Sequence, residues 1–348
     1  MVVRNSSGIF MDESETTSPL QSYLELLRLP NVFTAIADVA MGFFFVQAAW
    51  AFSDDPQQSL LPMGIWTVGL LAAASALLYS AGMVLNDVFD IELDREEQPD
   101  RPLPSGRIPL TSARWLGWQL LTLGILLASG TTVVLAKFPR AHTDNFVLAW
   151  LPAIVATALA VLIVLYNAGL KRTPLGPLAM GGCRTLNVLL GMSVLREPWR
   201  IEHWAVAAGI GVYIAGVTWF ARNDARRSDR RQLVAATLVM LAGVGLVGSL
   251  PWLTDDPDKL WLLRPLQPEL WRWHMLIVLL AGFVLARCAA AIISPSPGPV
   301  RAAVRRSITA LIFLDAAACY AGAGPFYAIL VAVLVVPTTI VGRWVDGG

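Results

Sequence analysis

A group of polar side chains closes one end of a long apolar segment. It consists of Asn86, Asp87, Asp90 and Asp94. The three aspartates follow an i, i+3, i+7 spacing, so on a helix their carboxylates line one face, and Asn86 lies one turn from Asp90. Carboxylates packed this closely raise one another's pKa unless a cation neutralises them. Mg²⁺ prefers oxygen ligands and often bridges carboxylates to a substrate phosphate. The motif therefore predicts a Mg²⁺ and diphosphate site, with Asp87, Asp90 and Asp94 as metal ligands and catalytic residues and Asn86 as a diphosphate-binding residue.

The residues after this motif predict a turn that carries phosphate-binding side chains. They read Asp100-Arg101-Pro102-Leu103-Pro104-Ser105-Gly106-Arg107-Ile108, in which two prolines and a glycine favour a turn over a helix. Arg101 and Arg107 could then fold back over the aspartates, and an arginine fork matches phosphate oxygens. The alternative is a solvated acidic helix end.

The composition predicts an integral membrane protein. Of the 348 residues, 56 % are hydrophobic and only 15 % are charged, whereas soluble domains carry about 25 % charged residues. The formal net charge of +1 argues against a nucleic-acid partner, because binding to a phosphate backbone needs a basic surface.

Apolar runs of membrane-spanning length recur along the chain and predict an all-α, polytopic helical bundle. The polar residues 1–24 predict a disordered tail, and 25–342 a single transmembrane domain. Gly322-Ala323-Gly324-Pro325 is a turn signal between the last two runs, which could also form one broken helix. The expected spans are 31–50, 65–86, 114–136, 147–166, 176–195, 203–221, 232–253, 272–292, 306–322 and 326–342.

The basic residues orient this bundle. Most of the 26 Lys and Arg residues fall in the loops on the side of the aspartate motif. Because cytoplasmic loops carry the excess of Lys and Arg, we expect the N-terminus and the motif on the cytoplasmic side of a multi-pass protein, in the cell inner membrane.

The motif Asn86-Asp87-xx-Asp90-xxx-Asp94 and the turn through Arg101 and Arg107 resemble the first aspartate-rich motif of the UbiA superfamily of intramembrane prenyltransferases. Leu27-Arg28-Leu29-Pro30-Asn31 also resembles that family. The resemblance covers roughly 25–322 and implies nine helices around a lipid-open cavity, with 326–342 as a tenth. It implies Mg²⁺ as cofactor and an isoprenyl diphosphate, whose isoprenyl group passes to a hydrophobic or aromatic acceptor within the membrane lipid.

The place of the family's second aspartate motif departs from its usual pattern. Here the chain reads Ala221-Arg222-Asn223-Asp224-Ala225-Arg226-Arg227-Ser228-Asp229. Asp224 and Asp229 are five residues apart, which turns them about 140° from each other on a helix. We expect Asp224 to survive as a metal ligand and catalytic residue, with Asn223 and Arg222 binding diphosphate. The alternative is an ordinary basic cytoplasmic loop.

Three further cations are candidates for the diphosphate. Lys171 and Arg172 follow Tyr166 in a loop between two expected spans, where the alternative is a set of interfacial cations. Arg184 lies within a span, where a charge suggests a function. It could contact diphosphate or pair with the buried Asp38.

Parts of the chain resemble one branch of the superfamily, the EboC-type UbiA-like proteins. These parts are Thr34–Asp38, Lys171–Pro177 and Ala221–Asn223. That branch is tied to precursor export, so it implies an alternative function: a non-catalytic protein that binds or exports a lipid or biosynthetic precursor. The buried charges Asp38, Arg184 and Asp315 also allow an ion-coupled transporter, although a transporter does not require the aspartate motif.

Overall fold

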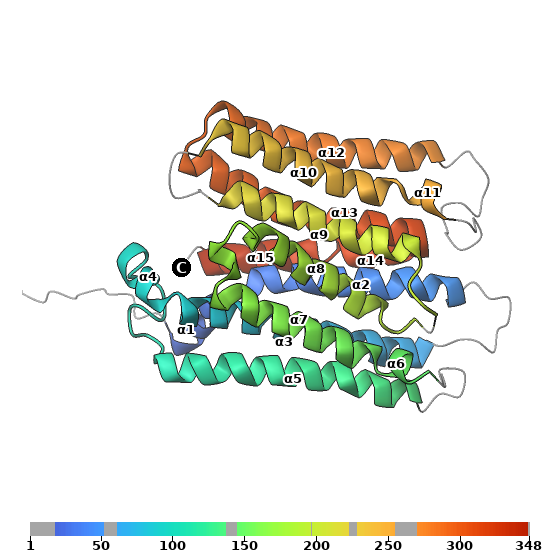
Figure 1. Cartoon of the computed structure of the whole chain (residues 1–348), viewed down its shortest axis with the longest axis horizontal. Coiled ribbons are helices and arrows are strands. Elements are labelled where there is room, and N and C mark those ends of the chain that lie inside the picture. The colour runs from blue at the N-terminus through green and yellow to red at the C-terminus, as the bar shows by residue number, and fades with distance from the viewer. Residues whose placement is uncertain are drawn as a thin grey trace, which may run out of the picture.

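The computed structural model describes residues 18–51, 61–136, 145–195, 197–222, 228–254 and 270–346. Within these ranges the chain is helical and forms no strand. The long helices run side by side along the long axis of the molecule (Figure 1). They are α2 (Leu29–Ala51), α3 (Leu61–Phe89), α5 (Leu110–Ala136), α7 (Leu151–Ala168), α8 (Gly176–Met192), α9 (Ile201–Ala221), α10 (Arg230–Gly248), α12 (Leu270–Ile293) and α13 (Pro297–Ala323).

Short elements lie at the two ends of the bundle and after its last long helix. They are α1 (Pro19–Leu26), α4 (Ile91–Glu97), α6 (Phe146–Ala149), η3 (Leu170–Arg172), α11 (Leu250–Leu253), α14 (Pro325–Ala332) and α15 (Val335–Asp346). Figure 1 places α1 and α4 at one end and α6 and α11 at the other.

The expected all-α membrane architecture is confirmed. Within the part of the chain that the structure describes, eight segments are long and apolar enough to cross a membrane, and each overlaps an expected span. The remaining two expected spans also fold as helices, α8 with 17 residues and α13 with 27. Proline in the first turn begins α7, α8 and α13, where its missing N–H costs no hydrogen bond.

Helix α2 lies in the middle of the bundle and packs against α3, α8 and α13. In Figure 1, α3, α5 and α7 lie on one side of it and α10 and α12 on the other. Glycines bring α2 and α8 close together: a Cβ atom on Gly42 would strike the Val188 carbonyl, and one on Gly191 would strike the Val39 carbonyl. Without a hydrophobic driving force between helices in lipid, such close approach supplies the packing energy.

The structure differs from the sequence-based expectation at both termini. Residues 1–17 lie outside the described residues, but 19–24, expected in the tail, are helical in α1, where the Ser18 side chain accepts a hydrogen bond from the Gln21 amide at 3.2 Å. The turn at Gly324 (φ 90°) is confirmed between α13 and α14. The expected span 326–342 is broken into α14 and α15, because Pro337 has no N–H to donate to the carbonyl of Val333.

Candidate active site

The aspartate motif lies where α3 gives way to α4. Asp90 occupies the junction with φ −98° and ψ 7°. The backbone keeps its helical course through it, since the Asp90 amide donates to the Asn86 carbonyl at 3.0 Å and the Asp94 amide to the Asp90 carbonyl at 2.8 Å. The expected helical display of the carboxylates is therefore retained across the junction.

Asp87 and Asp94 share one arginine. The Arg101 Nη1 atom lies 3.0 Å from Asp94 Oδ2 and 3.7 Å from Asp87 Oδ1, and Arg28 Nη2 lies 3.1 Å from the same Asp87 oxygen. Both aspartates are buried, with 4 % and 5 % exposed surface. Seven residues are almost two helical turns, so these carboxylates point in directions about 20° apart. One guanidinium can therefore reach both.

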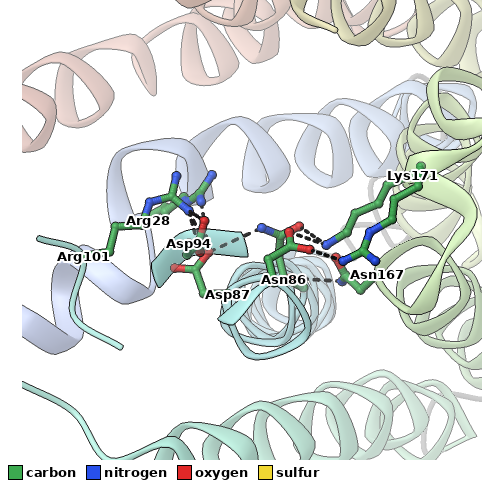
Figure 2. Close-up of polar contacts among 10 residues, drawn as sticks. Arg28, Asn86, Asp87, Asp94, Arg101, Asn167 and Lys171 are labelled. Atoms are coloured by element: carbon green, nitrogen blue, oxygen red, sulfur yellow. Dashed lines mark hydrogen bonds and ion pairs between the residues drawn. The ribbon is translucent and has the colours of Figure 1, made fainter. Parts of the chain in front are cut away.

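Asp90 faces a different loop. Its carboxylate accepts hydrogen bonds from Lys171 Nζ at 2.6 Å and from Arg172 Nη2 at 3.1 Å, and Lys171 also donates to Asn86 Oδ1 at 2.9 Å. Three residues turn the helix by about 300°, so Asp90 points about 60° away from Asp87. Figure 2 shows Arg28 and Arg101 on one side of the motif and Lys171 on the other, with Asn86 between them.

The three carboxylates do not converge on one point. Within the described ranges, no three His, Cys, Asp or Glu side chains are arranged to hold a metal ion. Asp94 pairs with Arg101 on one side of the motif, whereas Asp90 pairs with Lys171 on the other. The donor set still suits Mg²⁺, because it offers only carboxylate and amide oxygens that already lie against positive charge. Metal binding here requires some of these ion pairs to exchange.

The pKa of Asp94 is raised, as expected for a carboxyl group at a site that binds a cation. Burial raises the pKa of the Asp94 carboxyl above its ordinary value, and Asp87 and Asp90 raise it further, while Arg101 opposes the shift. A cation added at this point favours the ionised carboxylate.

Of the two arginines in the turn, the structure brings only Arg101 onto the aspartates. Arg107 lies 3.0 Å from Glu25 of α1 through its Nη1 atom and donates to the Asp100 carbonyl at 2.7 Å through Nη2. The expectation that Arg107 folds over the motif is therefore corrected, because the left-handed Gly106 (φ 77°) turns the chain toward α1. Arg107 ties the turn to that helix.

A cavity of about 170 Å³ opens beside the motif, between α2, α3, α7 and α8. Arg28 and Asn86 line it at the motif end, and Met83, Leu159, Ile163 and Met180 form apolar walls. Arg184 also lines it. Its Nη1 atom pairs with Asp38 at 2.8 Å, so of the two sequence-based alternatives the structure shows the pairing with Asp38.

The second motif is described only at its edges. Asn223 and Asp224 lie outside the described residues, whereas Arg222 Nη2 donates to the Thr173 carbonyl at 3.2 Å. The Asp229 side chain accepts the Arg231 amide at 3.0 Å as the N-cap of α10. Asp229 therefore lies just before the first turn of α10, and its position relative to Asp224 lies outside the described residues.

Sequence reasoning did not propose Arg28 as a site residue. Its backbone is left-handed, with φ 48°, a conformation that costs a non-glycine residue about 1–2 kcal/mol. This conformation joins α1 to α2 and lets the side chain reach Asp87, 59 residues away in the chain. In the sequence, only the resemblance of Leu27–Asn31 to the UbiA superfamily indicated that this position could matter.

The fold and the charged cavity mouth define a multi-pass membrane protein with an acidic and basic site at one end. Residues 39–289 match the UbiA prenyltransferase family, and the chain belongs to this family.

Curated relatives match over part of their length. The chain is 38 % identical over 109 residues to digeranylgeranylglyceryl phosphate synthase of Sulfurisphaera tokodaii, covering 31 % of this chain and 35 % of the relative. It is 31 % identical over 189 residues to the same enzyme of Ignicoccus hospitalis, covering 54 % and 52 %. The matched stretch thus spans about a third to a half of these relatives.

Solved structures share the fold over almost their whole length. A UbiA homologue from Archaeoglobus fulgidus bound to GPP and Mg²⁺ superposes with a TM-score of 0.55 at 14 % identity, covering 89 % of this chain and 99 % of that one. A structure of digeranylgeranylglyceryl phosphate synthase gives 0.54 at 20 % identity, covering 88 % and 99 %.

Proposed function

We propose that the protein transfers an isoprenyl group from an isoprenyl diphosphate to a hydrophobic or aromatic acceptor within the membrane, with Mg²⁺ as cofactor. The observation that carries this proposal is the position of the charged cluster. Arg28 and Asn86, which contact Asp87 and Lys171 of this cluster, line one end of a cavity. The walls of that cavity include the apolar side chains Met83, Leu159, Ile163 and Met180. A substrate with a charged head and an apolar tail would bind with its head at the charged cluster and its tail along the apolar walls.

The cluster supplies both partners that a diphosphate needs. Arg28, Arg101, Lys171 and Arg172 offer guanidinium and ammonium donors to its oxygens. Asp87, Asp90 and Asp94, with Asn86, would hold Mg²⁺, which adds positive charge beside the departing diphosphate. Asn223, Asp224 and Arg222 are proposed to complete this site from the loop between α9 and α10.

The apolar cavity walls are proposed to bind the isoprenyl tail. Met83, Leu159, Ile163 and Met180 surround the space next to Asn86. Apolar side chains there hold the isoprenyl tail and exclude water from the reacting carbon. The printed names of the relatives support the assignment, since they are synthases of digeranylgeranylglyceryl phosphate, and homologous structures hold GPP or DMAPP with Mg²⁺.

A transfer assay tests this function. We expect purified protein in lipid nanodiscs to convert labelled isoprenyl diphosphates to a lipid-extractable product when a membrane extract supplies the acceptor. EDTA should abolish the product and excess Mg²⁺ should restore it. If isoprenyl diphosphates of several chain lengths give no product with Mg²⁺, the proposed transfer is wrong.

The orientation in the cell is also proposed. The excess of Lys and Arg at the motif end supports a cytoplasmic N-terminus and motif, in the cell inner membrane. In a background with Cys183 replaced by Ser, a membrane-impermeant thiol reagent should label the exposed position of Asn145→Cys in intact cells. It should label Ser105→Cys at the opposite end only after lysis, and the reverse pattern contradicts this orientation.

A second candidate is a non-catalytic protein that binds or exports a lipid precursor. It is favoured by the N-cap role of Asp229, which leaves Asp224 alone as an acidic ligand in the second motif. This candidate predicts stoichiometric binding of a diphosphate lipid without turnover. Multiple turnovers in the transfer assay exclude it.

A further inference from the structure

A second polar cluster lies inside the bundle, away from the aspartate motif. It joins Asp38 of α2, Arg184 of α8 and Asp315 of α13. Arg184 Nη1 contacts Asp38 Oδ2 at 2.8 Å, and Asn187 Nδ2 donates to the same oxygen at 3.0 Å. Both aspartates are completely buried. Arg184 is only 8 % exposed.

Asp315 has no counter-charge of its own in this cluster. Both of its oxygens, like Asp38 Oδ1, are buried without a hydrogen-bond partner among the described residues. A carboxyl group buried without a partner avoids the cost of an isolated charge by keeping its proton. Asp38 is therefore the carboxylate that balances Arg184.

This protonation makes the cluster electrically neutral. The guanidinium of Arg184 is balanced by the negative charge of Asp38, 2.8 Å away. Neutrality matters in the membrane interior, where an unbalanced charge is expensive. A second anion placed against Arg184 would have no counter-charge of its own, and burying it would be costly.

Arg184 nevertheless presents donors to the cavity. Its hydrogen bonds to Asp38 and to Thr34 Oγ1, the latter at 2.9 Å, use two of the five N–H groups of a guanidinium. The guanidinium also lies over the Tyr79 ring, 5.2 Å from its centre. Both side chains line the cavity. Tyr79 precedes Asn86 by seven residues, so this point lies roughly 10 Å along the helix from the motif.

We propose that Arg184 binds an uncharged oxygen of the acceptor, a hydroxyl or a carbonyl, and that Asp38 is the positioning residue that holds it. This inference rests on the proposed function, because it assigns the second substrate of the same cavity. The diphosphate occupies the mouth at Asn86, and the acceptor oxygen lies deeper, against Arg184 and Tyr79.

Binding of probes with one chain and different heads tests the subsite. Native mass spectrometry is performed on the protein with saturating Mg²⁺ and pyrophosphate, using hexadecan-1-ol, hexadecanoate, hexadecyl phosphate and hexadecane. We expect the alcohol to bind about tenfold better than the hydrocarbon and better than either anion. Arg184→Gln should remove the preference for the alcohol. An unchanged preference in this variant, or stronger binding of an anion that depends on Arg184, overturns the proposal.

The role of Asp38 has its own test. Asp38→Asn removes the counter-charge of Arg184, so the alcohol preference should fall to the level of the hydrocarbon. Asp315→Asn replaces a neutral carboxylic acid with a neutral amide and leaves Asp38 in place, so alcohol binding should change by less than about twofold. An Asp38→Asn variant that keeps the preference, or an Asp315→Asn variant that loses it, overturns the assigned roles.

Two controls keep these outcomes interpretable. If Asp38→Asn does not fold, adding Arg184→Gln restores neutrality and should restore folding, but without the alcohol preference. A double variant that remains unfolded or keeps the preference contradicts the assignment. The thermal shift caused by Mg²⁺ and pyrophosphate should be equal in all folded variants. If Mg²⁺ and pyrophosphate cause no thermal shift in the unaltered protein, the proposed function is contradicted. The alcohol preference is measured separately, so a failure of the acceptor subsite is distinguished from a failure of the diphosphate site.

Discussion

Replacing Asp87 with asparagine is expected to reduce the initial rate of Mg²⁺-dependent isoprenyl transfer by about 10²–10³-fold, the usual effect of removing one group that stabilises transition-state charge. Asp87 is 4 % exposed and lies 3.1 Å from Arg28 and 3.7 Å from Arg101. The substitution preserves size and one oxygen but removes the negative charge. The rate and the Mg²⁺ concentration for half-maximal rate are measured together, and the latter should rise.

The matched control is Glu92→Gln. Glu92 lies at the same end of the molecule, and its side chain is 81 % exposed and pairs with Arg95 at 2.9 Å. Because an exposed pair of this kind contributes little, we expect a rate within about twofold of the unaltered protein. If the Asp87→Asn variant has the same initial rate as this control, Asp87 does not bind the metal.

The second large effect is expected at the contact between α2 and α8. In Gly191→Ala the new Cβ atom would strike the Val39 carbonyl oxygen and lie 2.9 Å from the Phe43 amide nitrogen. These are backbone atoms that cannot rotate away, so the helices must separate. We expect a loss of about 2–3 kcal/mol of stability, which is typical of overpacking, measured as a lowered Tm in detergent.

Gly130→Ala is the comparison for this change. Gly130 also lies within a long helix, but a Cβ atom there meets nothing within 4 Å. Alanine is a better helix former than glycine by about 1 kcal/mol, so the Tm should stay equal or rise. Equal Tm values for the two variants would show that close contact between α2 and α8 does not limit stability.

Much of the first motif could be predicted from the sequence because its geometry is local. The spacing of Asp87, Asp90 and Asp94 requires only the regular turn of one helix, and the return of Arg101 to Asp94 spans only seven residues. The expectation that Arg107 also folds back over the aspartates was wrong, because the turn at Gly106 directs its side chain toward Glu25 of α1.

By itself, the sequence determined the class of protein, the positions of the long apolar helices and the acidic face at the end of one of them. Hydrophobic periodicity and composition encode which residues are buried in lipid or protein. They do not encode which helices become neighbours. Only the tertiary structure joined Arg28 to Asp87, Lys171 to Asp90 and Arg184 to Asp38, across 59, 81 and 146 residues. These pairings depend on how the helices pack, and glycine contacts such as those at Gly42 and Gly191 set that packing.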